Sequence, residues 1–156
     1  MSTAIMNVRD TVSGSQGECF VTIGERRYNF MSLKKINAKM EKKKEKVTIL
    51  GKTGESNKTT GWKGSGTMSV YYNTSVLRKL MEVYKNTGED FYFDTQITNA
   101  DLASTAGRQT VILKDCNLDS IVLAMLDTES SNLEEDLDFT FDDFDIPESF
   151  TALVGM

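Results

Sequence analysis

The sequence contains no histidine, only two cysteines and a single proline among its 156 residues. The absence of histidine removes the most common general base and the most common metal ligand, which makes an enzyme less expected. The two cysteines, Cys19 and Cys116, have neither the spacing of a metal site nor the number needed for a disulfide framework, and they fit a reducing compartment. No nucleophile stands beside a base that a third group could orient, so the sequence offers no catalytic constellation.

Long hydrophobic runs are also missing. The N-terminal stretch has no apolar run of signal-peptide length, and no window approaches the length of a membrane span. Hydrophobic residues make up 39% of the chain and charged residues 26%, as in globular proteins. A chain of 156 residues has the size of one ordinary domain. We therefore expect a soluble, single-domain protein that is not exported through a cleaved signal.

What the sequence does contain is a strong separation of charge. Residues 34–63 carry ten lysines and three glutamates, a charge of +7, whereas residues 127–156 carry ten acidic residues and no basic one, a charge of −10. The remaining residues sum to −2, which gives the net charge of −5. Either run alone is equally well explained as a solvated face. Both runs in one small domain favour complementary contacts between copies, which supply register more than affinity.

Hydrophobic periodicity predicts about eight strands. The clearest is the last, where Leu137, Phe139 and Phe141 alternate with polar residues until the single proline ends the element. A segment at 34–50 also alternates, although its lysines and glutamates are good helix formers and leave a helix as the competing interpretation. The strand at 118–126 is apolar on both faces over its second half, so we expect it to be central or covered. The other strands are expected at 19–23, 28–33, 67–72, 91–97 and 110–113.

One helix is predicted over about residues 74–87. The polar residues at 73–75 offer N-caps, and Gly88 lies just past the end, where a left-handed residue is favoured. The apolar residues of this segment share one helical face: Val76, Leu77, Leu80, Met81 and Tyr84.

Residues 51–66 hold five glycines and no apolar periodicity, which predicts a long loop. Loops of this length in compact domains are usually functional or disordered, so we expect this one to contact another subunit. We expect an N-terminal arm at 1–16, a single β domain at 17–148 and a C-terminal tail at 149–156. The predicted fold class is mainly β: a two-sheet β-sandwich or barrel with one flanking α-helix.

Three motifs point to chemistry that their context does not support. Gly51-Lys52-Thr53 echoes a phosphate-binding loop, but position 46, where that motif requires glycine, is lysine. The acidic stretch 138–145 lacks the turn glycine of a calcium loop and has the pattern of a strand. The lysine run lies near Trp62, but few aromatic residues interleave with it and the protein is acidic overall, which argues against tight DNA binding. No catalytic residue, metal site or cofactor is predicted.

Three stretches of the sequence, in their order and spacing, carry a family resemblance. The first runs from Thr11-Val12-Ser13-Gly14 to Gly24-Glu25, the second is KTTG at 58–61 followed by GSGT at 64–67, and the third is FTFDDFDIPE at 139–148. Together they resemble the tail tube protein of PBSX-like contractile phage tails, a family that includes tube subunits of R-type phage-tail-like bacteriocins. The resemblance covers roughly residues 10–150, and the third stretch is its most specific part.

The resemblance implies a β-sandwich subunit with one helix, a structural protein and not an enzyme. Such subunits form hexameric rings that stack into a hollow tube, which a contracting sheath drives through the target envelope. The implied partners are further copies of the chain, the sheath protein, a tape measure protein in the lumen, and baseplate and terminator proteins, with DNA only as passing cargo. The protein would be made in the bacterial cytoplasm and assembled into a phage tail or bacteriocin particle released by lysis.

Two alternatives remain open beside this function. The first is a type VI secretion-like tube protein that carries effectors in place of DNA. The second is a non-catalytic carbohydrate- or receptor-binding β-sandwich module, which would be a monomer or small oligomer with aromatic-lined pockets. A hydrolase on the same scaffold is the weakest interpretation, because it would need a pocket with shifted carboxylates and the chain has no histidine.

The candidate interface residues follow from the charge separation and the predicted loop. We expect the loop to make ring-to-ring contacts and the basic strand to meet acidic groups on neighbouring copies, while one strand face lines the lumen with net negative charge. Trp62 either folds back onto its own domain or anchors in a partner, and the enrichment of aromatic residues at interfaces favours the partner. The candidates are Lys35, Lys39, Lys43, Lys46, Lys52, Lys58, Thr59, Thr60, Gly61, Trp62, Lys63, Glu134, Glu135, Asp136, Asp138, Asp142, Asp143 and Asp145.

Overall fold

The computed structural model describes residues 5–152, which form eight strands, one α-helix and one short 3₁₀ helix. The predicted number, about eight strands and one helix, matches this part of the chain, although not every strand lies where it is predicted. The elements in chain order are η1 (Val8–Asp10), β1 (Gly17–Ile23), β2 (Arg26–Asn29), β3 (Leu33–Val47), β4 (Ser56–Tyr71), α1 (Val76–Thr87), β5 (Phe93–Ala100), β6 (Arg108–Leu118), β7 (Glu134–Phe141) and β8 (Asp143–Glu148).

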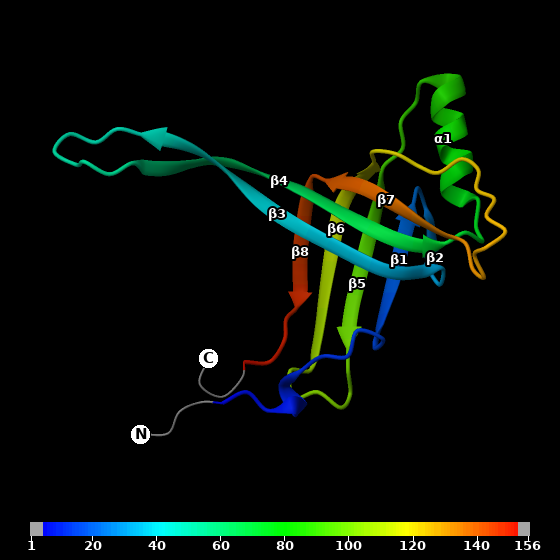
Figure 1. Cartoon of the computed structure of the whole chain (residues 1–156), viewed down its shortest axis with the longest axis horizontal. Helices are drawn as coiled ribbons and strands as arrows, with labels where there is room; N and C mark the ends of the chain where they lie inside the picture. Colours follow the sequence, from blue (N-terminus) through cyan, green and yellow to red (C-terminus); the bar gives the residue numbers. More distant parts are fainter. Residues whose placement is uncertain (1–4, 153–156) are drawn as a thin grey trace.

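All eight strands belong to one antiparallel sheet with the order β2-β1-β5-β6-β7-β4-β3, and β8 pairs with β6 beside this path. β6 joins the two halves, because most of it pairs with β5 and β8 while Asn117 and Leu118 pair with β7. Figure 1 shows β3, β4 and β7 crossing over β1, β5, β6 and β8. The mainly β fold with one helix is confirmed. A separate second sheet or a closed barrel is not, since the sheet is continuous and ends at β2 and β3.

The core lies between the two crossing halves of the sheet. On β7, Leu137, Phe139 and Phe141 are buried and the residues between them are exposed, which confirms the predicted alternation. Each such side chain contributes about 1.5–3 kcal/mol by leaving water. The other half of the sheet and the helix supply the remaining buried apolar residues, among them Val21, Leu77, Phe93, Leu113 and Cys116.

The glycines of β4 explain why the prediction of a loop over 51–66 is wrong. Residues 56–66 form the first part of β4, and only residues 48–55 form a turn between β3 and β4. A Cβ on Gly64 would lie 2.3 Å from the Phe141 ring, and a Cβ on Gly66 would lie 2.5 Å from the Phe139 ring. The two glycines let the rings of β7 lie across β4, so they mark a close approach within a sheet and not a flexible connection.

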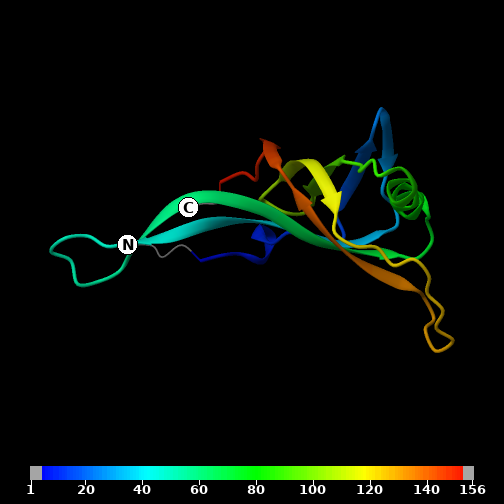
Figure 2. The same ribbon diagram turned by 90° about the horizontal axis from the view of Figure 1, so that it is seen from above.

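β3 and β4 form a hairpin that extends well beyond the rest of the sheet (Figures 1 and 2). The two strands pair from Leu33 to Val47, whereas β7 accompanies β4 only from Gly64 onward. We call residues 41–63 the arm and the remainder of the described chain the body. The seven paired residues of β3 in the arm span about 20–25 Å at strand geometry. The arm is thus a two-stranded ribbon that projects from the body.

The helix prediction is confirmed, with α1 beginning at Val76. Gly88 adopts the left-handed conformation at φ 77° and donates its N–H to the Tyr84 carbonyl oxygen at 2.8 Å. No described helix is long and apolar enough to cross a membrane.

The strand predicted at 118–126 is wrong, because β6 ends at Leu118 and the chain from there to 133 is irregular. Ile121 is partly buried against the core, whereas Leu123 and Leu126 are exposed, so most of this apolar run does not fill core positions.

The N-terminal residues from 7 to 16 lie along the loop that joins β5 and β6. The Thr105 N–H donates to the Arg9 carbonyl oxygen at 2.8 Å, and the Ser13 N–H donates to the Asp101 carboxylate at 2.8 Å. The predicted N-terminal segment 1–16 is therefore hydrogen-bonded to the body of its own chain. Its residues 1–4 lie outside the described residues. The single proline does not end the last element, since β8 runs on to Glu148. Part of the predicted tail, 153–156, lies outside the described residues.

Candidate subunit-interface surfaces

The side of β3, β4 and β7 that points away from the core forms one polar surface, which we call the outer face. Its residues follow from the strand register. Lys35 lies opposite Ser69 and Ser69 opposite Asp136, while in the next rows Thr67 separates Asn37 from Asp138 and Ser65 separates Lys39 from Thr140. The Ser69 hydroxyl donates to Asp136 at 2.6 Å. The outer face thus has lysines along β3, hydroxyls along β4 and carboxylates along β7.

The two charged runs of the sequence meet within one sheet at a single described ion pair. Lys34 Nζ lies 2.9 Å from both carboxylate oxygens of Glu134, and this hydrogen bond and charge raise the pKa of Lys34. The pair is exposed, so it contributes little to stability. Elsewhere β4 separates the runs, and contact between them on neighbouring copies remains a prediction.

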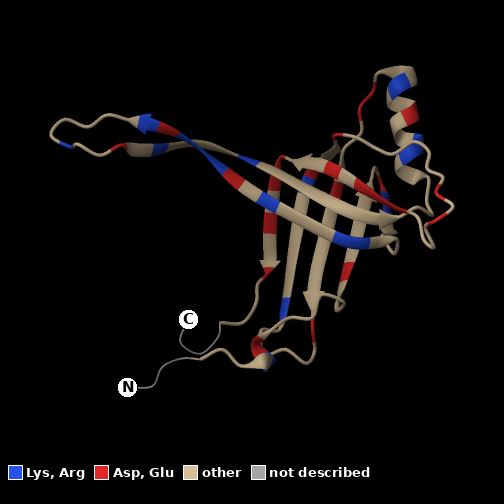
Figure 3. Cartoon of the chain, in the orientation of Figure 1, with Lys and Arg blue, Asp and Glu red and all other residues tan. Residues whose placement is uncertain are grey.

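The arm carries more positive charge than its own carboxylates neutralise. Glu41 lies 2.7 Å from Lys39 and 3.7 Å from Lys63, and these ammonium groups hold the pKa of Glu41 below its ordinary value. Lys46 pairs with Glu55 at 3.4 Å. Five further lysines of the arm form no ion pair with the described part of the chain: Lys42, Lys43, Lys44, Lys52 and Lys58. Figure 3 shows this basic stretch along the projecting hairpin.

The end of the arm exposes three apolar side chains beside polar residues of the turn. Val47, Ile49 and Leu50 are all exposed there, and Leu50 is fully so. Lys52 follows within the turn and donates to the Ser56 hydroxyl at 2.8 Å. Apolar side chains clustered at the end of a projecting basic ribbon are an unusual surface for a monomer and are typical of a contact site.

The KTTG stretch at 58–61 lies on β4 where the hairpin register shifts, between Lys43 and Lys44 of β3. The Thr60 hydroxyl donates to the Lys43 carbonyl oxygen at 3.3 Å. Trp62 follows and packs on its own body, with its ring centroid 5.8 Å from that of Phe144 and 6.5 Å from that of Phe141. The structure therefore shows the intradomain contact of Trp62. The exposed 38% of this residue is the part that could still face a partner.

Glu135 does not belong with the exposed acidic candidates. Its side chain is 3% exposed and lies 2.7 Å from Arg78 Nη1, whose own side chain is 14% exposed. Arg78 also stacks over the Tyr72 ring at 4.4 Å and donates to the backbone carbonyl oxygens of Thr74 and Val122. The pair joins α1, the irregular segment and β7. The alternation along β7 could have predicted that Glu135 is buried, because Glu135 falls on the same side of the strand as Leu137 and Phe139.

The remaining acidic candidates lie at the turn from β7 into β8. Asp142 is the residue between the two strands, and the Asp143 carboxylate accepts the Phe144 N–H at 2.8 Å. Asp145 pairs with Lys114 at 2.6 Å, which raises the pKa of Lys114. Asp138 stays on the outer face. The structure therefore distributes the acidic run over a buried pair, an outer face and a corner, and does not present it as one patch.

The two cysteines lie in the core. Burial raises the pKa of the Cys19 thiol to about 12 and that of the Cys116 thiol to about 11, so both remain protonated at neutral pH. A protonated, buried thiol is chemically inert.

An open antiparallel sheet with a projecting, charged hairpin defines a class of protein: a β-sheet subunit built for assembly. The family model described as phage tail tube protein matches residues 4–148, and the chain belongs to this family. It is therefore a structural tube subunit, and the resemblance seen in the three sequence stretches is confirmed.

Individual relatives agree with this family. The phage-like element PBSX protein XkdM of Bacillus subtilis is 39% identical over 94% of this chain and 97% of its own length. The fold resembles a chain of an extracellular contractile injection system, the PVC sheath-tube complex, with a TM-score of 0.63 at 12% identity over 91% of this chain and 94% of the other. It also resembles the SPP1 tail tube, with a TM-score of 0.61 at 8% identity over 87% and 78%. At these identities the two structures show the shared fold.

Proposed function

We propose that this chain forms hexameric rings that stack into the inner tube of a contractile phage tail or phage-tail-like bacteriocin. The tube is a hollow conduit that passes through the target envelope when the surrounding sheath contracts. This role is mechanical and needs no catalytic step. The observation that carries the proposal is the unfinished sheet: within the described part of the chain, no strand pairs with the outer edge of β3 or with the β4 edge of the arm away from β3.

Ring formation would complete this sheet. β3 is an end of the strand order, and β7 is flanked by β6 only at Phe139 and Thr140, so its first half is open on that side. Exposed strand edges readily pair with another chain, and closure into a barrel removes them. The two open edges carry opposite charge, with lysines on β3 and carboxylates on β7. The barrel that the single chain does not form is therefore proposed as a property of the ring.

The carboxylate side of β7 is the surface we propose for the lumen. Asp136 and Asp138 lie on the outer face next to the hydroxyls of β4, which gives a polar and negative lining. Such a lining repels DNA and prevents it from sticking during passage. Tubes of the double variant Asp136→Asn, Asp138→Asn should retain added duplex DNA that native tubes release. A density map with a mostly basic lumen would refute this arrangement.

The arm is the part we propose for contacts between rings, in place of the predicted loop. Lys44 and Thr59 are cross-strand partners, so residues 45–58 can be replaced by an Asn-Gly turn without cutting into the body. The shortened chain should fold with an unchanged unfolding temperature and form no tubes in electron micrographs. Tubes of normal length from this variant would contradict the role of the arm.

The remaining partners follow from the proposed tube. The sheath protein would surround it, baseplate and terminator proteins would meet its ends, and a tape measure protein would occupy its lumen during assembly, with DNA as cargo in a true phage. The subunit would be made in the bacterial cytoplasm and released by lysis inside the particle. The alternative is a secretion-type tube that carries effectors, and the neighbouring genes distinguish the two. Electron microscopy of the purified chain should show rings of sixfold symmetry, and a monomer under all conditions would contradict the proposal.

A further inference from the structure

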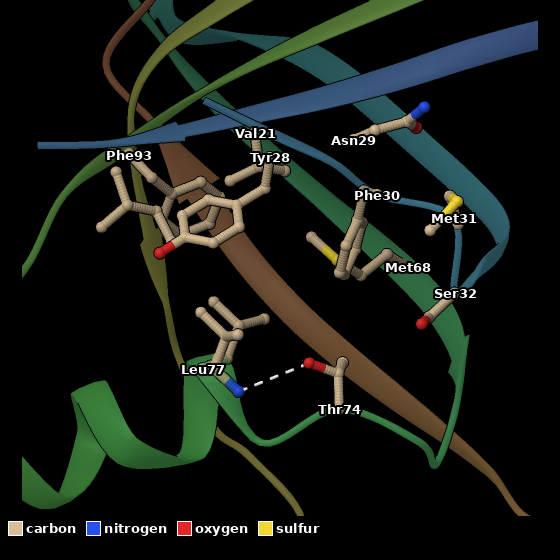
Figure 4. A pocket seen from close by; sticks show the side chains of 12 residues that line it. Val21, Tyr28, Asn29, Phe30, Met31, Ser32, Met68, Thr74, Leu77 and Phe93 are labelled. Carbon is tan, nitrogen blue, oxygen red and sulfur yellow. Dashed lines mark hydrogen bonds between the residues drawn. The ribbon is translucent and has the colours of Figure 1, made fainter. Parts of the chain in front are cut away.

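The body contains an apolar cavity of about 250 Å³ beside the N-terminal end of α1. Figure 4 shows Val21 and Phe93 on one side, Phe30 and Met68 on another, and Leu77 from the helix. Small-molecule sites usually measure about 300–1,000 Å³, whereas a cavity of about 150 Å³ already accepts a benzene ring. The cavity therefore has the size for one or two apolar side chains and not for a cofactor.

The cavity and the arm turn lie at opposite ends of the long axis of the molecule. In Figure 1 the arm projects to one side, and the β2–β3 connection and the start of α1, which line the cavity, lie at the other. Because the arm turn and the cavity lie at opposite ends, they do not contact each other within one chain. Two copies in head-to-tail order bring the turn of one copy to the cavity of the next.

The charges at the two ends are complementary. The arm is basic, whereas the segment that leads into β7 carries Asp127 and Glu129, which form no ion pair in the described part of the chain (Figure 3). This acidic segment adjoins the cavity, because the Leu133 carbonyl oxygen accepts the Tyr72 N–H at 2.9 Å and Ser32 on the cavity wall bonds to Asn73 at 2.5 Å. A copy that approaches with its arm is thus steered toward the cavity end of its neighbour.

Resting on the proposed tube function, we propose that Leu50 of one copy inserts into this cavity of the next copy. The lysines that flank the turn then lie against the acidic segment 127–134 of the same neighbour. The contact joins two different surfaces, so it is heterologous and repeats from copy to copy, as the growth of a ring or a stack requires. It would bury a leucine that is fully exposed at the end of the arm.

A disulfide between copies tests this contact directly. Met31 lines the cavity and is 84% exposed, so the double variant Leu50→Cys, Met31→Cys should give a ladder of covalently linked chains when tubes are oxidised. The native cysteines are both buried and do not compete. The matched control is Leu102→Cys with Met31→Cys, because Leu102 is as exposed as Leu50 but lies in the β5–β6 loop, and it should give no ladder.

Removing the leucine tests the contribution of the same contact. Leu50→Ser should raise the protein concentration needed for tubes by roughly ten- to a hundredfold, the factor expected for burial of one leucine. Leu102→Ser should leave it unchanged, and neither change should alter thermal unfolding. Two results would overturn the contact and leave the tube function standing. In the first, the double variant Leu50→Cys, Met31→Cys forms tubes but no disulfide between copies. In the second, the ladder forms with Leu126→Cys, Met31→Cys in place of that pair. A native chain that never forms rings or tubes would overturn both.

Discussion

The body and the arm of this chain use the same antiparallel pairing, but they differ in what surrounds it. In the body, β7 pairs beside β4, and its buried Phe139 and Phe141 rings lie over Gly66 and Gly64, so a core holds these strands together. In the arm, the ribbon has a partly exposed Trp62 at its base, exposed lysines along it and an exposed Leu50 at its end. An isolated two-stranded hairpin is only marginally stable in water. We therefore expect the arm to gain part of its order from a neighbouring copy.

The largest effect should come from the buried ion pair of the body. Glu135→Ala leaves Arg78 buried without its carboxylate, which should lower the free energy of unfolding by about 3–5 kcal/mol. Chemical denaturation measures this change. Glu134→Ala is the matched control, because Glu134 is the exposed neighbour in the same strand, and it should change stability little. Equal losses from the two variants would contradict the different placement of these adjacent residues.

A smaller effect should separate the glycines of the body from those of the arm. Gly66→Ala places a methyl group against the Phe139 ring and the Asn37 carbonyl oxygen, which should lower the free energy of unfolding by about 1–3 kcal/mol. Gly61→Ala in the arm meets nothing within 4 Å and should be close to neutral. Thermal unfolding of the two variants gives the comparison. A neutral Gly66→Ala would remove the packing explanation for the glycine-rich stretch.

The lysines of the arm should affect assembly and leave folding unchanged. Replacing Lys42, Lys43, Lys44 and Lys58 by glutamine should not alter the unfolding temperature, because these side chains form no ion pair in the described chain. Tube formation should weaken and become less sensitive to salt, since screening acts on exposed charges within about 10 Å at ordinary ionic strength. Sedimentation of tubes across a salt series measures both. An unchanged salt dependence would favour assembly through apolar burial alone.

The smallest effect should be a local shift in titration at the base of the arm. The pKa of Glu41 lies below its ordinary value of 4.5, mainly because Lys39 donates a hydrogen bond to its carboxylate. The stabilisation from a lowered pKa is present above the ordinary value and is lost as the pH falls through the folded-state value. Carbon-detected NMR of the free chain should find this lowered pKa. Lys39→Ala should move it back toward 4.5, and an unchanged value would show that the contact is not formed in solution.

The difference between body and arm also explains what the sequence could predict. Leu137, Phe139 and Phe141 of β7 and Leu77 and Leu80 of α1 pack in the chain's own core, so their periodicity in the sequence predicts their structure. Residues 51–66 were predicted as a loop because glycine is a poor strand former, and nothing local reveals that two of those glycines accommodate rings from a distant strand. The apolar run at 121–126 resembles a buried strand although it is largely exposed. Ile121 packs against the core of the single chain, whereas Leu123 and Leu126 do not.

For the candidate interface residues, too, the sequence predicted some features correctly and missed others. The charge separation identified the basic arm and the acidic outer face of β7, but the choice of Glu135 followed from charge alone and ignored the side of the strand on which it falls. The Lys34–Glu134 pair within one chain also needed the strand order, because the two residues are 100 positions apart. Pairings between copies remain predictions, since they depend on surfaces that come together only on assembly.

Hydrogen exchange in free subunits and in assembled tubes is the most direct test of the contrast between body and arm. Amide hydrogens of residues 41–63 should exchange quickly in the free chain and become strongly protected in tubes, since local opening of an isolated ribbon requires little free energy. The amides of β5, β6 and β7 should be protected in both states. Arm amides that are equally protected before and after assembly, or equally unprotected, would contradict the claim that a neighbouring copy completes this part of the fold.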